Sequence, residues 1–308
     1  MIISTSDITR QTVGDLQGFI QASRKQYLDQ IETTAAYLRE HQQDMPIVLL
    51  SGPSGSGKTT SALLLEQQLE KWGLETHTLS MDNYFSPLTE EEKQLLAEHK
   101  LDLESPNRVD ADFLNGQLAD LADGKEILLP RYDFATASRV FDGKTLQRKP
   151  GEIVIMEGIH ALNPDVTGQI GDRAVCLYVS VRTRVQASDG TVLHPKKIRV
   201  MRRMLRDSIF RGRSCEDIIK MAASVDRGEN LYIMPYKNRA KYHINTFLPY
   251  ELSVYKTGLW GQMEELAERN PEIRDTVKIL SELEAIDFEA VPKDSLIREF
   301  IGGSVFSY

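Results

Sequence analysis

The stretch GPSGSGKTT, residues 52–60, fits the pattern G-x-x-x-x-G-K-[ST]. The preceding residues IVLLS, 47–51, are apolar and rich in β-formers, which predicts a buried strand. The following residues carry apolar side chains at helical spacing as far as Gly73, a residue type common at helix C-termini. Because a strand, a glycine-rich loop and a helix in this order form a phosphate-binding loop (P-loop), we predict one here.

The P-loop pattern also predicts which residues contact a nucleotide. Glycines let backbone N–H groups turn toward phosphate oxygens, and the helix N-terminus favours negative charge. Lys58 is expected to contact the outer phosphates, and Thr59 to bind Mg²⁺. The predicted nucleotide-binding residues are Gly52, Ser54, Gly55, Ser56, Gly57, Lys58, Thr59 and Thr60.

Composition narrows the function class. The chain has 308 residues and a net charge of -8, which argues against a general nucleic-acid binder. Its two cysteines, Cys176 and Cys215, have no metal-ligand spacing and suit a reducing compartment. The N-terminal residues lack the features of a signal peptide, and no apolar run is long enough to span a membrane. We therefore expect a cytoplasmic protein without a membrane segment, and the sequence leaves open whether it forms a homo-oligomer.

Strand and helix patterns alternate along most of the chain. The expected strands are IVLLS, ETHTLSM, EIVIMEG, AVCLYVSV and YHINTFL, and their nearly continuous apolar character suits a parallel sheet covered on both faces. The predicted fold class is α/β, the three-layer fold of P-loop nucleoside triphosphate hydrolases, with a helical lid and an extra N-terminal helix over 12–41. The predicted regions are an N-terminal helical extension (1–45), a P-loop core (46–250) and a C-terminal helical extension that packs on the core (251–308).

Two carboxylates follow predicted strands. Asp82 lies in SMDNYF after the second strand, and Glu157 lies in MEGIHALNP at the end of the third. Because ligands of such sheets gather at the carboxyl ends of strands, both side chains are expected near the P-loop. A carboxylate there can help to bind Mg²⁺ or accept a proton from an attacking hydroxyl.

Residues 196–213, KKIRVMRRMLRDSIFRGR, contain eight basic residues and a single acid, Asp207. This segment could be a solvated basic face or a nucleic-acid patch, although it has no interleaved aromatic residues. Beside a P-loop we favour a lid whose arginines close over the transferring phosphate.

Six separated motifs resemble those of the uridine kinase and phosphoribulokinase family of P-loop kinases. They are GPSGSGKT, SMDNYF, ESPNRVD, PRYDFATASR, IVIMEGIHAL and RRMLRDSIFRGR, and the resemblance spans about residues 46–250. It implies that Asp82 is the catalytic base and that Glu157 helps to organise Mg²⁺. It also implies phosphate contacts by three lid arginines and acceptor contacts by three further residues: Arg206, Arg211 and Arg213 in the lid, and Arg203, Tyr132 and Phe134 at the acceptor.

The chain departs from the uridine kinase pattern at the acceptor site. Ala137 occupies the position of a histidine that reads the base, and Glu104 occupies that of an aspartate that holds ribose hydroxyls. Residues 186–197 look like an insertion ahead of the lid. The C-terminal sequence SLIREFIGGSVFSY resembles that of a longer bacterial branch of uridine kinase-like proteins.

The function expected from these features is an ATP- and magnesium-dependent kinase of a small-molecule acceptor, with the 5′-hydroxyl of a nucleoside favoured. The alternatives are a kinase of a sugar phosphate or of a pantothenate-like alcohol, a nucleotide-dependent switch, and a silent binding module. DVTG, residues 165–168, matches the D-x-x-G of GTPases, but no N-K-x-D motif follows it. The sequence does not identify the acceptor.

Overall fold

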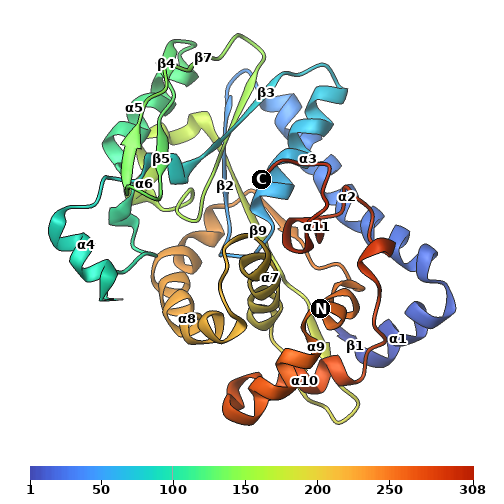
Figure 1. Ribbon diagram of the computed structural model, residues 1–308. Helices are drawn as coiled ribbons and strands as arrows, with labels where there is room; N and C mark the ends of the chain where they lie inside the picture. Colours follow the sequence, from blue (N-terminus) through green and yellow to red (C-terminus); the bar gives the residue numbers. More distant parts are fainter. Residues whose placement is uncertain (99) are drawn as a thin grey trace.

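A central sheet of five parallel strands organises the computed structural model, which describes residues 1–98 and 100–308 (Figure 1). The strand order is β12-β9-β2-β8-β3. The bounds are β2 Ile47–Ser51, β3 Thr76–Ser80, β8 Ile153–Glu157, β9 Ala174–Ser180 and β12 Tyr242–Asn245. All five predicted strands are present and parallel, so the predicted fold class is confirmed.

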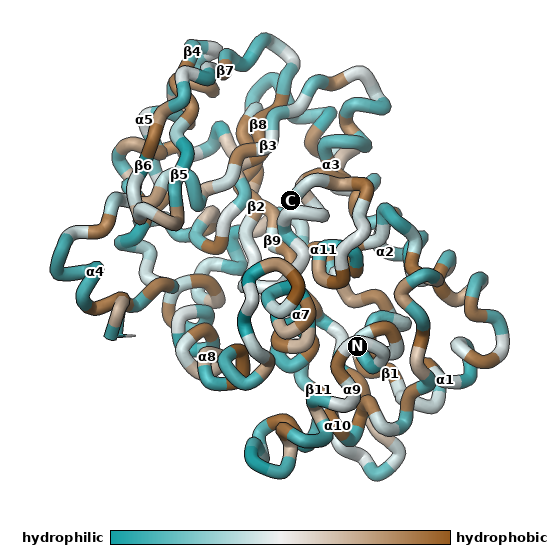
Figure 2. The backbone as a smooth tube through the Cα atoms, in the orientation of Figure 1, coloured by the Kyte–Doolittle hydropathy of each residue, from teal (hydrophilic) through white to brown (hydrophobic). Residues whose placement is uncertain are grey.

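Helices cover both faces of this sheet. Alternate residues of β2 enter two different apolar clusters, Val48 and Leu50 on one face and Ile47 and Leu49 on the other, and all four are fully buried. Figure 2 shows the same pattern as brown central strands among paler and teal peripheral segments. The helices are α1 Thr5–Gly14, α2 Leu16–His41, α3 Lys58–Lys71, α4 Glu90–Ala97, α5 Ala111–Ala122, α6 Pro164–Thr167, α7 Pro195–Phe210, α8 Cys215–Gly228, α9 Glu251–Arg269, α10 Arg274–Ser281 and α11 Arg298–Ile301.

The N-terminal extension forms two helices where the sequence predicted one. The break falls between Gly14 and Leu16, and Asp15 caps α2 by accepting a hydrogen bond from the backbone N of Gly18 at 2.9 Å. Helix α2 packs on α3, and the hydroxyls of Tyr27 and Ser61 lie 2.8 Å apart. The extension therefore contacts the helix that follows the P-loop.

Short strands outside the main sheet were not predicted. One small sheet joins β1 Ile2–Ser4, β10 Arg184–Gln186 and β11 Val192–Leu193, so the N-terminus pairs with the segment around the apparent insertion. Two further antiparallel pairs are β4 Glu126–Leu128 with β7 Thr145–Gln147, and β5 Arg131–Asp133 with β6 Ser138–Val140. Strands of two or three residues are too short to produce a recognisable periodicity in sequence.

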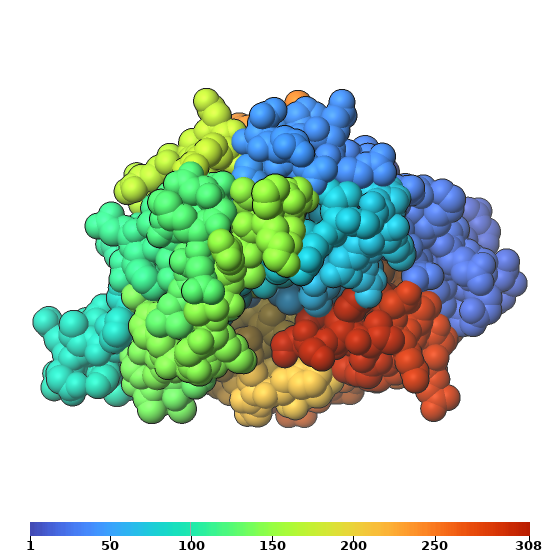
Figure 3. Space-filling view, turned by 90° about the horizontal axis from the view of Figure 1, so that it is seen from above, coloured from blue at the N-terminus to red at the C-terminus, as the bar shows by residue number. Residues whose placement is uncertain are grey.

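Residues 292–308 form a C-terminal strap across α7 and the start of α3. The strap contains α11. Phe300 of this helix and the preceding Leu296 and Ile297 are almost completely buried. In Figure 3 the red C-terminal residues reach the surface beside gold atoms near the α7–α8 junction. None of the helices in the described residues has the length and hydropathy needed to cross a bilayer.

Candidate active site

The P-loop is shaped by glycines that no other residue could replace without displacement of the backbone. A Cβ at Gly52 would lie 2.0 Å from the carbonyl oxygen of Val179 on β9. Gly55 and Gly57 have φ angles of +71° and +86°, in the left-handed region that favours glycine. Helix α3 begins immediately afterwards at Lys58, so its first N–H groups face the loop.

The carbonyl groups of the loop are held from the outer side. Arg199 donates to the carbonyl of Ser54 at 3.1 Å, and Arg202 donates to that of Gly55 at 3.2 Å. The hydroxyl of Thr246 donates to the carbonyl of Ser56 at 2.7 Å. The N–H of Ser56 donates to the carbonyl of Pro53 at 3.1 Å. Because the three carbonyls are bonded within the protein, the other N–H groups of the loop can turn toward a phosphate. The sequence does not mark these three residues as supports of the loop, although Arg199 and Arg202 lie in the basic segment 196–213.

The loop fits the phosphates of a nucleotide. The Ser56 hydroxyl is buried and has no hydrogen-bond partner among the residues that the structure describes, which leaves one polar group of the loop for a ligand to satisfy. The amine of Lys58 has only a weak contact, 3.5 Å from the carbonyl of Pro53. Thr60 differs from expectation, because its backbone N–H and its hydroxyl donate to Glu299 of the strap at 3.3 and 2.5 Å.

Three adjacent strands place the carboxylates beside the P-loop. Leu50 of β2, Glu157 of β8 and Ser80 of β3 lie in register across the sheet, so the residues that follow them share one edge. Asp82 lies in the 3₁₀ turn Met81–Tyr84 directly after β3. The structure therefore brings Asp82 and Glu157 together at the mouth of the loop, as predicted.

The Lys58 charge acts on both carboxyl groups. Burial raises the pKa of Glu157 to about 7, the Lys58 ammonium opposes this rise, and Asp82 and Glu299 add to it. Desolvation raises the pKa of Asp82, while the charges of Lys58 and Arg211 lower it. No lysine or arginine of residues 1–98 and 100–308 forms an ion pair with Glu157, and a hard divalent cation ligated by oxygen atoms would supply a positive charge there.

Glu104 is a further carboxyl group within electrostatic reach of Lys58, and Arg203 lies near it. Burial raises the pKa of Glu104, and Arg203 and Lys58 lower it. Arg203 is 5% exposed, and its Cγ atom would lie 3.4 Å from a Cβ at Gly55. Gly228 of α8 lets the Glu104 segment approach, since a Cβ there would lie 2.3 Å from that of Glu104.

The two predicted aromatic contacts differ in accessibility. Tyr132 is 6% exposed and Phe134 is 68% exposed, with their ring centroids 5.1 Å apart. The backbone N of Tyr132 donates to the side chain of Asn83 at 3.2 Å, which attaches the β5–β6 hairpin to the Asp82 turn. Only Phe134 of the pair presents an open ring face. Ala137, in the turn of this hairpin, has a φ of +51°.

The basic segment is more fully paired than the sequence indicated. Arg199 pairs with Glu229 at 2.6 Å, and the fully buried Arg202 pairs with Glu251 at 2.8 Å. Lys196 pairs with Asp226. These acids lie outside residues 196–213, so the sequence of the segment alone could not show them.

Asp207 gathers the three predicted lid arginines at the end of α7. Its carboxylate is 1% exposed and lies 2.8 Å from Arg206, 3.5 Å from Arg211 and 3.6 Å from Arg213. Arg211 and Arg213 are the more exposed pair, with 54% and 43% of their side-chain surface accessible. The predicted lid residues therefore form one cluster, and Arg211 is near enough to Asp82 to lower the pKa of that carboxyl.

His160, in the motif IVIMEGIHAL, is a buried polar residue of this region to which the sequence assigned no role. It is 1% exposed, and neither ring nitrogen makes a hydrogen bond of good geometry, although carbonyls of Glu104 and Tyr232 lie nearby. Burial lowers the pKa of His160 to about 4, so the ring is neutral at physiological pH.

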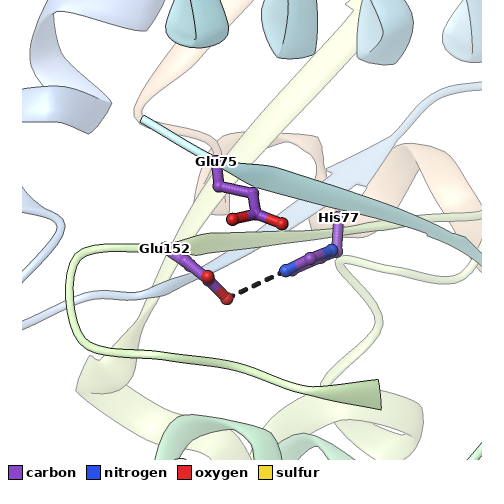
Figure 4. Close-up of side chains that lie close together, drawn as sticks. All are labelled: Glu75, His77 and Glu152. Atoms are coloured by element: carbon purple, nitrogen blue, oxygen red, sulfur yellow. Dashed lines mark hydrogen bonds and ion pairs between the residues drawn. The ribbon is translucent and has the colours of Figure 1, made fainter. Parts of the chain in front are cut away.

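A separate group of potential metal ligands lies at the other edge of the sheet. Glu75, His77 and Glu152 stand at the amino-terminal ends of β3 and β8 (Figure 4). The Nε2 atom of His77 lies 2.9 Å from Glu152, which also accepts a hydrogen bond from the backbone N of Lys149 at 2.8 Å. These contacts satisfy Glu152 within the protein, so we assign the group to the attachment of β3 to the β7–β8 turn.

Comparison with known proteins gives concordant results. A model of the Phosphoribulokinase / Uridine kinase family matches residues 47–250. Uridine kinases of Lactobacillus johnsonii and Staphylococcus aureus are both 32% identical to the chain, over 203 and 197 residues. These alignments cover 65% and 63% of this chain, and 86% and 84% of the two relatives.

Two solved structures show partial similarity. One, described as "a Possible Uridine Kinase" from Bacillus stearothermophilus, has a TM-score of 0.44 at 16% identity, with 70% of this chain and 98% of that chain covered. The other is D-glycerate 3-kinase from Cryptococcus neoformans, with a TM-score of 0.33 at 16% identity and coverage of 92% and 90%.

Proposed function

The chain belongs to the phosphoribulokinase/uridine kinase family and is an ATP-dependent phosphotransferase; we propose that it transfers the γ-phosphate to a small-molecule hydroxyl, with the 5′-hydroxyl of a nucleoside favoured. The observation that supports this proposal best is the position of Lys58. Its charge acts on Asp82, Glu104 and Glu157, which come from three separate segments of the chain.

The residues divide into three roles in this proposal. Lys58 and the loop N–H groups bind the phosphates, and the lid cluster of Arg206, Arg211 and Arg213 screens their charge. Thr59 and Glu157 would hold Mg²⁺, with Asp82 adjacent, and the ion would neutralise charge that develops on the phosphate oxygens. The proposed Mg²⁺ ligands all lie at the carboxyl ends of the strands, so this Mg²⁺ site needs no protein group from elsewhere.

Proton transfer falls to Asp82 in this proposal. A carboxylate at the mouth of the loop can accept the hydroxyl proton of the acceptor. The pKa of Asp82 is raised toward neutral pH, and a general base works best when its pKa lies near the operating pH. Glu104 can accept hydrogen bonds from further hydroxyls of the acceptor. The charge of Arg203 lowers the pKa of Glu104 and so favours its carboxylate form.

A kinase of another alcohol is the second candidate, because the base-reading groups are weak. Ala137 offers no side-chain hydrogen bond, and Tyr132 is covered, so stacking on Phe134 remains as the contact for a flat base. Such stacking tolerates different bases, whereas hydrogen-bonded recognition can discriminate by 10⁴ or more. We therefore expect weaker discrimination among acceptors than in a dedicated uridine kinase.

The test is ADP release with ATP and Mg²⁺ and a panel of uridine, cytidine, purine nucleosides, pantothenate and simple sugar alcohols. We expect ADP release that depends on the acceptor and is lost in the Lys58→Ala variant. We also expect comparable kcat/KM values for several acceptors. A strong preference for uridine and cytidine over all others would contradict the expected weak discrimination. Equal ADP release with and without every acceptor would favour the nucleotide switch instead.

A further inference from the structure

The C-terminal strap contacts the P-loop and the start of α3 at three points. Glu299 accepts hydrogen bonds from the backbone N and the hydroxyl of Thr60, at 3.3 and 2.5 Å. The Tyr308 hydroxyl lies 3.1 Å from the same Thr60 hydroxyl. A Cβ at Gly57 would lie 2.6 Å from a methyl carbon of Leu296. The strap is therefore packed against the nucleotide-binding loop itself.

Thr60 offers donors of the kind that a phosphate needs. It is the third residue of α3, so its N–H has no partner within the helix. In a P-loop the N–H groups at the start of this helix bind phosphate oxygens, and the helix N-terminus favours an anion. Glu299 is an anion that already occupies two donors of that residue.

The surroundings keep Glu299 in this position. The side chains on both sides of it anchor the strap: Arg298 donates to the carbonyls of Phe288 and Val291 at 2.8 and 2.7 Å, and Phe300 is fully buried. Glu299 itself is 9% exposed. Its charge also raises the pKa of Glu157, so it lies within electrostatic reach of the proposed metal site.

We propose that Glu299 is an intramolecular competitor of the nucleotide, which must give up the Thr60 donors before a polyphosphate can bind. This inference rests on the proposed function, because it requires the P-loop to bind a nucleotide. The competition should affect any ligand that carries a polyphosphate. The competing group, the Glu299 carboxylate, lies at a helix N-terminus and contacts no feature specific to a base.

Equilibrium titration tests the proposal with Mg·ATP, inorganic tripolyphosphate and adenosine as probes. The Glu299→Gln variant keeps the size and the acceptor oxygen but loses the charge that opposes the phosphates. We expect its Kd for ATP and for tripolyphosphate to fall by about tenfold or more, and that for adenosine to stay within about twofold of the native value. Glu284, an exposed acid outside the strap, provides the matched control, and Glu284→Gln should bind ATP like the native protein.

The outcomes separate this inference from the proposed function. Native protein that binds ATP, with unchanged or weaker binding by the Glu299→Gln variant, overturns the competition alone. Binding by the variant but not by the native protein supports both proposals. Absence of ATP binding in both proteins rejects the proposed function, and the inference falls with it.

A second variant covers the case in which Glu299→Gln fails to fold. Tyr308 is 54% exposed, so Tyr308→Phe removes its hydroxyl contact with Thr60 without a cost to the core. Loss of one competing hydrogen bond should tighten ATP binding by about two- to threefold and leave adenosine unaffected. Identical ATP affinities of this variant and the native protein would overturn the proposal in that case.

Discussion

Asp82 is the residue whose replacement tests the chemistry most directly. The Asp82→Asn variant keeps the size of the side chain but removes the proton acceptor, so turnover should fall by roughly 10² to 10⁴ with little change in ATP affinity. Steady-state kinetics combined with ATP titration would measure both quantities. A parallel loss of ATP affinity and rate would make Asp82 a metal ligand, and unchanged turnover would make it a structural turn residue.

His160 provides a pH-dependent test at the same scale. An unfolded histidine binds a proton near pH 6.5, whereas burial holds the pKa of His160 at about 4. Between these values the unfolded state binds more protons, so the free energy of unfolding falls as pH falls, by about 3 kcal/mol over the whole window. The His160→Asn variant should not show this decrease in unfolding free energy at low pH.

The measurement is the difference in unfolding free energy between native and His160→Asn proteins at several pH values from 7 to 4. A difference is needed because Glu157 acts in the opposite direction: its pKa of about 7 makes the folded state bind more protons, so its contribution is lost as pH rises. A difference that stays constant with pH would show that His160 is not held neutral by burial.

At the scale of elements, the lid should divide into a fixed and a mobile part. The first three turns of α7 are held by the buried pairs of Arg199 and Arg202, whereas Arg211 and Arg213 are about half exposed around Asp207. We expect an ATP analogue to slow hydrogen exchange at residues 208–214 and to change residues 195–206 little. Unchanged exchange at 208–214 would argue for a static basic face.

The elements also show what sequence can and cannot predict. Strands β2, β8 and β9 were predictable because each is an apolar run, and β3 and β12 because each is a short segment between helical patterns. The partners of Arg199 and Arg202 were not, since Glu229 and Glu251 lie 30 and 49 residues further along the chain. The position expected for Asp82 and Glu157 near Lys58 followed from the P-loop motif and from strand order, without any knowledge of side-chain packing. Their separate roles were implied by the resemblance to the kinase family.

The contact between Thr60 and Glu299 shows the same limit more strongly, because 239 residues separate the two. The SMDNYF and EGI motifs mark their own positions by local pattern. No local pattern marks a glutamate in the strap as a partner of the P-loop, so this feature required the folded structure.

At the scale of the whole molecule, the region matched by the family is not expected to fold alone. Helix α2 contributes Phe19, Ile20, Tyr27, Ile31 and Leu38 to the main apolar cluster. Burial of such side chains is worth about 1.5–3 kcal/mol each, so their combined contribution approaches the usual net stability of a domain. A fragment of residues 46–250 should therefore be insoluble or unfolded.

Circular dichroism and thermal denaturation of that fragment, compared with the full chain, would check this expectation. The region boundaries at 45 and 250 remain a proposal, and a cooperative melt of the fragment with native-like stability would support independent folding of the core. A chain that lacks only residues 1–4 is a suitable control, because it loses β1 but keeps every apolar side chain of α2.

The outward carbonyls of the P-loop have a thermodynamic consequence. Arg199, Arg202 and Thr246 already bind three successive carbonyls, so the loop is held in one conformation before any ligand arrives. A preorganised loop loses little conformational entropy when it takes up a ligand. Calorimetric titration with nucleotide should accordingly show only a small entropic penalty from ordering of the loop. Removal of the Thr246 hydroxyl should increase that entropic penalty more than it changes the rate of the chemical step.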